Sequence, residues 1–412
     1  MTDAEEMIMP KLVQYGAGNI GRGFIGPLFS EAGYEVVFID INTEIVNQLN
    51  RDRAYPLRIV SPAGSRESMV KNVRAVHGTD QDAVAREIAT AELLATSIGA
   101  NILPRIAGNL AAGFRTRWQS AGGIAGAIRP LDILLCENLH HAASYMANWL
   151  REVLQPEEIP LFERSIGLVE TSIGRMVPVM TPEMQEGNLL RVIAESYCLL
   201  PVDKAAFKGP VPEVPGLLPF SPFSFYTDRK LYIHNLGHAM AAYLGNIRKF
   251  TYIWEAVEDP AIRSVCISAM GESAAALSRE YGIPFQEIQS HVDDLMQRFG
   301  NRMLGDTVDR VGRDTLRKLS AEDRLAGAVR LCQRNSIHPE HICMGIAAAL
   351  LFDGEDPCTQ TIQIMTREKG PETVLQSVCG LDPCSEGDAG IIQEICRQYR
   401  RQADQLEIRK SY

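Results

Sequence analysis

Short runs of β-branched and aromatic residues alternate with helical patterns in the first half of the chain. This alternation is typical of a parallel sheet whose strands are joined by crossover helices. Between the first two runs the spacing predicts a helix over residues 19–32, which Gly33 ends. The predicted strands are Lys11 to Tyr15, Glu35 to Asp40, Glu92 to Ser97, and Asp132 to Cys136. The pattern therefore predicts an α/β domain of the Rossmann type with a mostly parallel sheet.

The second half of the chain changes character after a proline-rich segment. Six prolines fall within residues 201–222, which therefore cannot be helical throughout. We place the domain junction there, with a first domain over residues 1–205 and an all-α domain over residues 206–412. The amphipathic stretches that predict its helices are Ile262 to Tyr281, Phe285 to Phe299, Ala321 to Gln333, and Glu340 to Phe352.

Composition narrows the class of partner. The 412 residues carry 41 basic and 51 acidic side chains, a formal net charge of -10, and no long basic run. A nucleic acid or an anionic membrane is therefore not the expected partner, although a local basic pocket for a small phosphorylated ligand is compatible. No stretch has the roughly 18 uncharged apolar residues that span a bilayer. Nine scattered cysteines without CxxC spacing favour a reducing compartment. We expect a cytoplasmic protein, monomeric rather than dimeric.

A glycine-rich turn follows the first predicted strand. Gly16, Gly18 and Gly21 form the GxGxxG pattern, in which the first glycine allows a tight turn, the second a close approach to pyrophosphate, and the third packing of helix on strand. The helix start that contains Asn19 and Ile20 would present free N–H groups to the phosphates. The pattern alone also fits a glycine-rich turn of any α/β protein. Its position between a strand and a helix favours dinucleotide binding.

Asp40 bears on the choice of dinucleotide. It closes the second predicted strand, 19 residues after Gly21, where a carboxylate can accept hydrogen bonds from an adenosine ribose. The same carboxylate would repel a 2′-phosphate, so NAD is favoured over NADP; the alternative is a surface acid at a strand end. We add Ser97 and Gly99, at and just after the end of the third predicted strand, to the cofactor-binding candidates.

The second domain begins with a polar trio suited to hydride chemistry. If residues 230–245 form one α-helix, Lys230 and His238 point about 80° apart, and Asn235 about 140° from Lys230. A lysine can remove a hydroxyl proton, an amide can stabilise the resulting alkoxide, and an imidazole can orient a polyol. Burial and a nearby positive charge would favour the neutral amine. From these residues alone, a solvated helix start at Lys230 and a core histidine at His238 are equally open.

Longer segments then resemble a known family. The run from Gly16 to Gly26 reads GAGNIGRGFIG, and the run from Lys230 to Gly245 reads KLYIHNLGHAMAAYLG. Cys136-Glu137-Asn138 and several later segments add to the match, which spans nearly the whole chain. The sequence thus resembles the polyol-specific long-chain dehydrogenases of the mannitol dehydrogenase family.

The resemblance implies a function and roles for individual residues. It implies an NAD-dependent, metal-independent enzyme that transfers hydride between mannitol 1-phosphate and NAD+ in a cleft between the two domains, giving fructose 6-phosphate. Lys230 takes the position of the general base, and Asn235 and Asn138 those of the oxyanion-stabilising amides. His238 takes that of the histidine that orients the substrate. Lys208, Arg229 and Arg313 are candidate partners of the phosphate, unranked.

One departure keeps a second substrate class open. The family usually has an aspartate where this chain has Gly174, so a sister enzyme acting on free mannitol or on a uronate remains an alternative. A non-catalytic NAD(H)-binding sensor on the same scaffold is the alternative of another class. Among other histidines, His338 and His341 have helical spacing, but Pro339 between them and the lack of a third ligand argue against a metal site.

Overall fold

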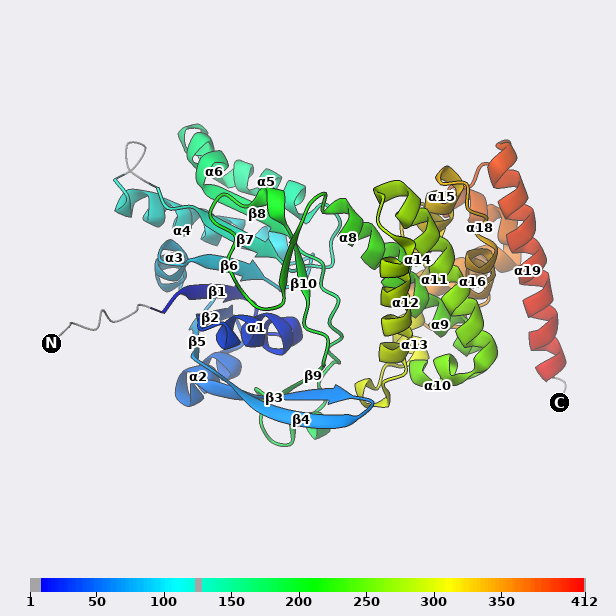
Figure 1. The fold of residues 1–412 in the computed structure, drawn as a ribbon, viewed down its shortest axis with the longest axis horizontal. Coiled ribbons are helices and arrows are strands. Elements are labelled where there is room, and N and C mark those ends of the chain that lie inside the picture. The colour runs from blue at the N-terminus through cyan, green and yellow to red at the C-terminus, as the bar shows by residue number, and fades with distance from the viewer. Residues whose placement is uncertain (1–8, 123–127, 411–412) are drawn as a thin grey trace. The chain divides into compact units, whose positions relative to one another are not determined.

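The structure of the chain is a computed structural model that describes residues 9–122 and 128–410. The chain folds into two compact units, Met1–Ser224 and Phe225–Tyr412 (Figure 1). This division lies 19 residues after the expected boundary at residue 205. The reason is that β10 (Leu200–Asp203) pairs with β11 (Leu217–Phe220), which keeps the intervening proline-rich chain in the first unit.

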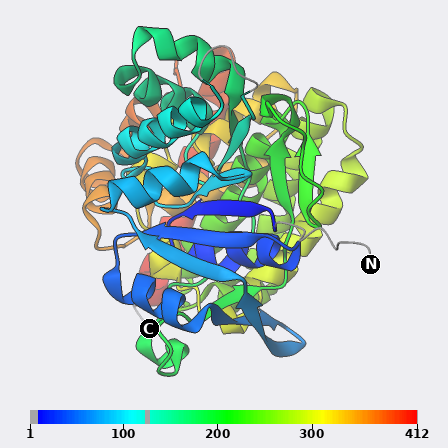
Figure 2. The same ribbon diagram turned by 90° about the vertical axis from the view of Figure 1, so that its left-hand side faces the viewer.

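A six-stranded parallel sheet forms the centre of the first unit, in the order β5-β2-β1-β6-β7-β8. Figure 2 shows the twist of this sheet. The first two predicted strands have the expected bounds, and the other two lie within one residue of them. The strands are β1 (Lys11–Tyr15), β2 (Glu35–Asp40), β5 (Val73–His77), β6 (Leu93–Thr96), β7 (Leu131–Leu135) and β8 (Ile166–Glu170).

Both faces of the sheet are covered, because successive residues of each strand point to opposite faces. Leu12 and Val36 pack in one core with the segments after the glycine turn and with a small second sheet. Val13 and Val37 pack in the other core, against α3, α4, α5 and α6. The small sheet consists of β4 (Gly64–Lys71), β3 (Ala54–Ser61) and β9 (Val192–Glu195), in that order.

The helices of the first unit connect these strands. The predicted helix over residues 19–32 is a π-helical turn, η1 (Gly21–Ile25), followed by α1 (Gly26–Glu31). The remaining helices are α2 (Thr43–Asp52), α3 (Gln81–Ala89), α4 (Ala107–Ser120), α5 (Ala142–Val153), α6 (Ile159–Ser165) and α7 (Pro182–Gln185), with short turns η2 (Leu103–Ile106), η4 (Pro156–Glu158) and η5 (Lys204–Ala206).

The described part of the second unit is helical apart from one isolated bridge between Tyr252 and Thr307. The predicted fold class is therefore confirmed. The helices are α8 (Ser224–Arg229), η6 (Lys230–Asn235), α9 (Leu236–Ile247), α10 (Ile253–Glu258), α11 (Pro260–Tyr281), α12 (Phe285–Phe299), η7 (Arg302–Leu304), α13 (Val308–Gly312), α14 (Thr315–Lys318), α15 (Ala326–Arg334), α16 (Glu340–Leu350), α17 (Pro357–Lys369), α18 (Pro371–Ser377) and α19 (Glu386–Lys410).

Helix α9 forms the centre of this unit. Ten of its 12 residues are buried, as expected of a helix that is apolar all round and enclosed by others. The helix predicted from Ala321 begins only at Ala326. The Asp323 carboxylate accepts a hydrogen bond from the backbone N–H of Arg324 at 2.7 Å, and such a local bond competes with helix formation.

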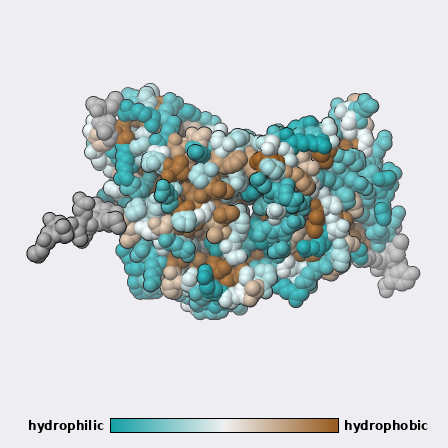
Figure 3. Space-filling view, viewed as in Figure 1, coloured by the Kyte–Doolittle hydropathy of each residue, from teal (hydrophilic) through white to brown (hydrophobic). Residues whose placement is uncertain are grey.

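The surface fits a protein with scattered rather than continuous apolar exposure. On the face drawn in Figure 3, hydrophobic residues lie in small groups among hydrophilic ones. Among the described residues, no helix combines the length and the apolar character needed to cross a bilayer.

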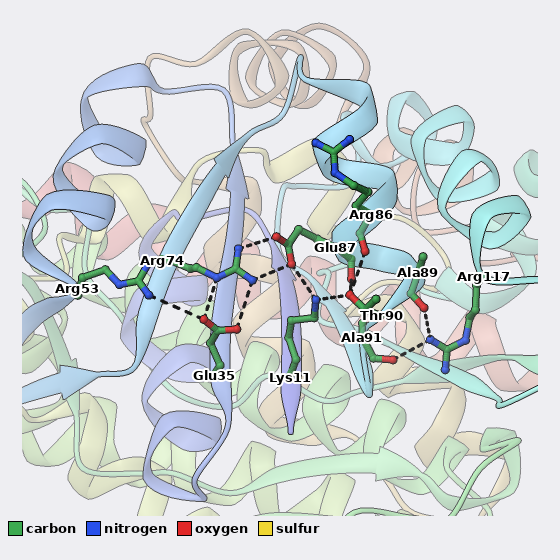
Figure 4. A network of polar contacts seen from close by, with 10 residues as sticks. All are labelled: Lys11, Glu35, Arg53, Arg74, Arg86, Glu87, Ala89, Thr90, Ala91 and Arg117. Atoms are coloured by element: carbon green, nitrogen blue, oxygen red, sulfur yellow. Dashed lines mark hydrogen bonds and ion pairs between the residues drawn. The ribbon is translucent and has the colours of Figure 1, made fainter. Parts of the chain in front are cut away.

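A charge network joins the amino ends of the central strands (Figure 4). The Lys11 ammonium lies 2.8 Å from the Glu87 carboxylate, which also accepts hydrogen bonds from Arg74 at 2.6 and 2.8 Å. Arg74 contacts Glu35 as well, at 2.8 Å. Although burial alone would raise it, hydrogen bonds from Arg74 and Lys11 lower the pKa of Glu87 to about 2. The network therefore stabilises the first unit wherever Glu87 is ionised.

Replacing Glu87 by glutamine should lower the free energy of unfolding by about 1 kcal/mol at neutral pH. The folded-state pKa of Glu87 is depressed, so this stabilisation is complete above the ordinary value of 4.5 and disappears as the pH falls toward about 2. Urea denaturation over that pH range should show the two proteins converge. Glu163→Gln, in an exposed pair with Arg151, is the control and should change little. A difference between the Glu87 variant and the parent that persists unchanged at the acid end would contradict this assignment.

Candidate functional site

The glycine turn after β1 is built by close backbone contacts. Gly16 has a φ of +96°, and its N–H donates to the Ile39 carbonyl at 2.8 Å. A Cβ on Gly16 would lie 2.6 Å from the Ser97 carbonyl oxygen, and a Cβ on Gly21 only 2.2 Å from the Gly16 carbonyl oxygen. Gly18 is exposed, with no protein atom within 4 Å of its Cβ position. Two glycines therefore shape the turn, and the third leaves it open to a ligand.

The helix after this turn begins with a π-helical turn rather than the regular helix that the spacing predicts. The N–H of Gly26 donates to the Gly21 carbonyl, five residues earlier. Arg22 braces the turn from inside, because its buried guanidinium donates to the Ala17 carbonyl at 2.6 Å and to the Leu189 carbonyl at 3.0 Å. Burial lowers the pKa of Arg22.

The two candidates between the glycines, Asn19 and Ile20, are half-buried. The Asn19 amide donates to the Pro178 carbonyl at 3.1 Å. Its side chain is thus engaged by the segment after β8, and its contribution to a phosphate site would come from the backbone of the helix start.

Asp40 lies beside the glycine turn. Its Oδ2 accepts a hydrogen bond from the Ala17 N–H at 2.7 Å, and its Oδ1 accepts one from the Asn42 N–H at 2.9 Å. A carboxylate has about four acceptor positions, so these two bonds leave room for a ribose hydroxyl. Asp40 therefore both stabilises the turn and offers an acceptor at the end of β2.

Ser97 and Gly99 form the loop after β6. Ser97 donates its N–H to the Tyr15 carbonyl at 2.9 Å, and its Oγ accepts from the Gln14 amide at 2.9 Å. Gly99 has a φ of +91° and, like Gly18, no protein atom within 4 Å of its Cβ position. Its N–H donates to the Glu137 carboxylate at 2.9 Å. The loop is thus tied to the protein and open at Gly99.

The strand order brings these segments to one edge of the sheet. β1, β6 and β7 are neighbours and parallel, so the glycine turn, the loop of Ser97 and Gly99, and the exposed Asn138 all follow carboxyl ends at that edge. The chain passes from β1 to β2 on one side, whereas β6 lies on the other. Ligands of open α/β sheets bind where the strand order reverses in this way.

The second unit presents Lys230 and Asn235 on a π-helical turn, η6, where regular α-helical spacing was expected. The N–H of Leu236 donates to the Leu231 carbonyl, five residues earlier. In an α-helix residues five apart point about 140° apart, whereas in a π-helix each residue is hydrogen-bonded to the one five positions on. Lys230 and Asn235 therefore face a common side, which corrects the predicted angle between them.

His238 lies in the first turn of α9 and is held by two side chains. Its ring stacks on Phe299, with centroids 4.9 Å apart and an interplanar angle of 8°. Its Nε2 lies 3.3 Å from Oδ2 of Asp306, which also contacts Arg310. Burial alone would raise it, but His238 and Arg310 lower the pKa of Asp306 below its usual range. Asp306, 68 residues along the chain, was not predicted, because no local pattern links it to His238.

The neighbouring His234 belongs to the core. It is buried and packs edge-on against Phe299, with ring centroids 5.7 Å apart. Burial, together with Arg298 and His238, lowers the pKa of His234 well below its usual value. His234 is therefore neutral, in contrast to the half-buried His238 beside a carboxylate.

The three candidate phosphate partners lie in different settings. The N–H of Lys208 donates to Asp132 at 2.7 Å near the amino end of β7, the edge opposite the candidate site, which argues against a role for Lys208. The Arg229 guanidinium lies 4.4 Å from the centre of the Tyr226 ring. Arg313 is exposed.

Gly174 lies four residues after the end of β8, half-buried. A Cβ there would lie 3.1 Å from the Tyr197 ring. Tyr197 therefore occupies the space into which a side chain at position 174 would extend. The loss of an aspartate at Gly174 is thus accompanied by an aromatic side chain in its direction.

Comparisons with known proteins agree with both units. The family described as the mannitol dehydrogenase Rossmann domain matches residues 10–216, and the mannitol dehydrogenase C-terminal domain matches residues 223–382. Two proteins named mannitol-1-phosphate 5-dehydrogenase align over 94% of this chain. The one from Brevibacillus brevis is 36% identical over 98% of its own length, and the one from Bacillus pumilus is 33% identical over its full length.

Solved structures show the same fold at low sequence identity. A D-sorbitol dehydrogenase in substrate-free form has a TM-score of 0.76 at 15% identity, covering 97% of this chain and 94% of that one. The Pseudomonas fluorescens mannitol 2-dehydrogenase, in a ternary complex with NAD and D-mannitol, has a TM-score of 0.71 at 13% identity, covering 98% and 95%. With both domain matches and the full-length relatives, the chain belongs to the mannitol dehydrogenase family and is an oxidoreductase of that type.

Proposed function

We propose that the protein is an NAD-dependent dehydrogenase that interconverts D-mannitol 1-phosphate and D-fructose 6-phosphate. The observation that carries the proposal is the π-helical turn that turns Lys230 and Asn235 to one side, one turn before His238. A proton acceptor, an amide donor and an imidazole so arranged suit oxidation of a hydroxyl group. Two relatives similar over almost the whole chain bear the corresponding name, which supports the phosphorylated substrate.

NAD fits the edge of the first unit. Gly18 and Gly99 leave open space where a pyrophosphate and a nicotinamide ribose need close backbone approach, and Asp40 offers acceptor oxygens at the position of the adenosine ribose. When bound, NAD supplies the hydride acceptor. The negative charge of Asp40 disfavours the 2′-phosphate of NADP.

Each proposed catalytic residue handles the substrate. Lys230 takes the proton of the hydroxyl group being oxidised. Asn235 and Asn138 donate hydrogen bonds to the oxygen as its negative charge develops, and His238 orients the sugar chain. In the reverse direction Lys230 returns the proton to the oxygen.

Replacing Asp40 by asparagine should weaken NAD binding and narrow the preference over NADP. The variant loses the charge that repels a 2′-phosphate and weakens the acceptor for the ribose, so we expect kcat/KM for NAD to fall by roughly tenfold, because each lost hydrogen bond to a charged group contributes about 1.5–3 kcal/mol. Initial rates with both cofactors measure this. Asp52→Asn, on α2 beyond the sheet edge, is the control. An unchanged NAD/NADP ratio would remove Asp40 from cofactor selection.

The substrate is tested in the direction of reduction. With NADH, fructose 6-phosphate should be reduced with a far higher kcat/KM than fructose, tagaturonate or fructuronate. The pair of Gly174 and Tyr197 favours keeping the second candidate, a polyol or uronate dehydrogenase of the same family, in the comparison. Preference for an unphosphorylated sugar or a uronate would establish that candidate. NADH binding without turnover of any of the four would instead indicate a non-catalytic sensor.

A further inference from the structure

A buried carboxylate joins the loops after β6 and β7. Glu137 is 6% exposed. Its Oε1 accepts a hydrogen bond from the Ile98 N–H, and its Oε2 accepts one from the Gly99 N–H, both at 2.9 Å. A carboxylate is costly to bury unless its oxygens are hydrogen-bonded, so two aligned amides make this position specific for an acid. The bonds fix the loop after β6 to the residue next to Asn138.

A second buried side chain continues this connection to β1. Gln14 is fully buried, and its Nε2 donates to the Tyr15 carbonyl at 2.8 Å and to Ser97 Oγ at 2.9 Å. Gln14 thereby connects the end of β1 to the loop after β6, as Glu137 connects that loop to the one after β7. The three loops at the candidate cofactor edge are held to one another by these two side chains.

The position of Glu137 in the chain gives its bonds a consequence beyond stability. Asn138 follows it directly and is exposed, so the two bonds fix the backbone from which Asn138 extends. They also turn the Gly99 N–H inward and leave the opposite side of Gly99 open. Small displacements of groups around a reacting centre reduce rates strongly, about 100-fold for 1 Å.

We propose that Glu137 is a positioning residue for hydride transfer. By holding two consecutive amides of the loop after β6, it sets the distance between the Gly99 loop, where the cofactor binds, and Asn138, which stabilises the alkoxide-like oxygen. This inference rests on the function proposed above, because it assigns Glu137 to the same reaction.

The same strand carries a matched control. Asp132 is buried at 3% exposure, and its carboxylate accepts hydrogen bonds from the Lys208 N–H at 2.7 Å and the Gly209 N–H at 3.0 Å. Asp132 and Glu137 thus make the same kind of contact, to two consecutive backbone amides. Asp132, however, lies near the amino end of β7 and Glu137 just past its carboxyl end. Asp132→Asn removes the same charge at the opposite edge of the sheet.

The test compares Glu137→Gln with Asp132→Asn. In the free protein, Glu137→Gln should speed hydrogen exchange of the Ile98 and Gly99 amides at least about tenfold, whereas Asp132→Asn should leave both unchanged. With substrate and NAD, Glu137→Gln should lower kcat by about 10- to 100-fold at temperatures where both variants are folded. Because Glu137 acts through Asn138, adding it to Asn138→Ala should lower kcat little further.

Three results would overturn the inference. They are a kcat equal to that of Asp132→Asn, unchanged exchange of the two loop amides, and fully multiplicative effects of Glu137→Gln and Asn138→Ala. If Glu137→Gln does not fold, Glu137→Asp, which keeps the charge but shortens the reach, is measured in the same way. Failure of the proposed function shows separately, as a parent protein that reduces no sugar. The exchange measurement and NADH titration then still decide whether Glu137 holds the cofactor loop.

Discussion

Lys230→Ala should lower kcat by about 10²- to 10⁴-fold while NADH binding stays unchanged. The proposed reaction needs a group that removes the hydroxyl proton, and Lys230 is the residue on the π-helical turn of η6 that can do so. A methyl group cannot accept a proton, so the loss falls on the chemical step rather than on cofactor affinity. Stopped-flow measurement of hydride transfer, beside a fluorescence titration with NADH, separates the two quantities.

Lys249→Ala is the control for this change. Lys249 lies in the same unit, on the surface, where its ammonium pairs with Asp353 at 2.7 Å. The same loss of a lysine there should leave kcat within about twofold of the parent, because exposed pairs contribute little. Full turnover by Lys230→Ala, with NADH binding intact, would show that another group is the base.

Gly21→Ala should abolish most NAD binding, with a loss of affinity on the order of 100-fold, which corresponds to about 3 kcal/mol of overpacking. The added methyl group would lie 2.2 Å from the Gly16 carbonyl oxygen, a backbone atom that cannot move without reshaping the turn. Calorimetric titration with NAD and thermal unfolding measure affinity and stability separately.

Gly108→Ala supplies the comparison. Gly108 lies in α4 of the same unit, and a Cβ there meets no atom within 4 Å. This variant should bind NAD normally and be as stable as the parent or slightly more so, because alanine favours helices over glycine by about 1 kcal/mol. Normal NAD affinity in Gly21→Ala would mean that the glycine turn is not the phosphate site.

The parts of the fold that are encoded locally could be predicted. Strands β1 and β2 have the predicted bounds because they are short apolar runs that end at turn residues or an acid. The glycine turn was predictable because its chemistry lies within six consecutive residues. The position of Asn138 at the ligand edge followed from one rule, that parallel strands share a carboxyl edge.

The remaining features depend on contacts between distant segments. The π-helical turns η1 and η6 insert no residue type that marks them, so α-helical spacing gave the wrong angle between Lys230 and Asn235. Asp306 contacts His238 from another helix connection, and Glu137 hydrogen-bonds a loop 38 residues earlier. Burial and pairing of this kind arise only once the chain is folded.

The most direct test of the account is NADH formation from mannitol 1-phosphate and from mannitol, each with NAD+ and with NADP+, followed by the absorbance of the reduced cofactor. The account predicts turnover with mannitol 1-phosphate and NAD+, and little with the other three pairs. Equal or faster oxidation of free mannitol, or a preference for NADP+, would contradict it.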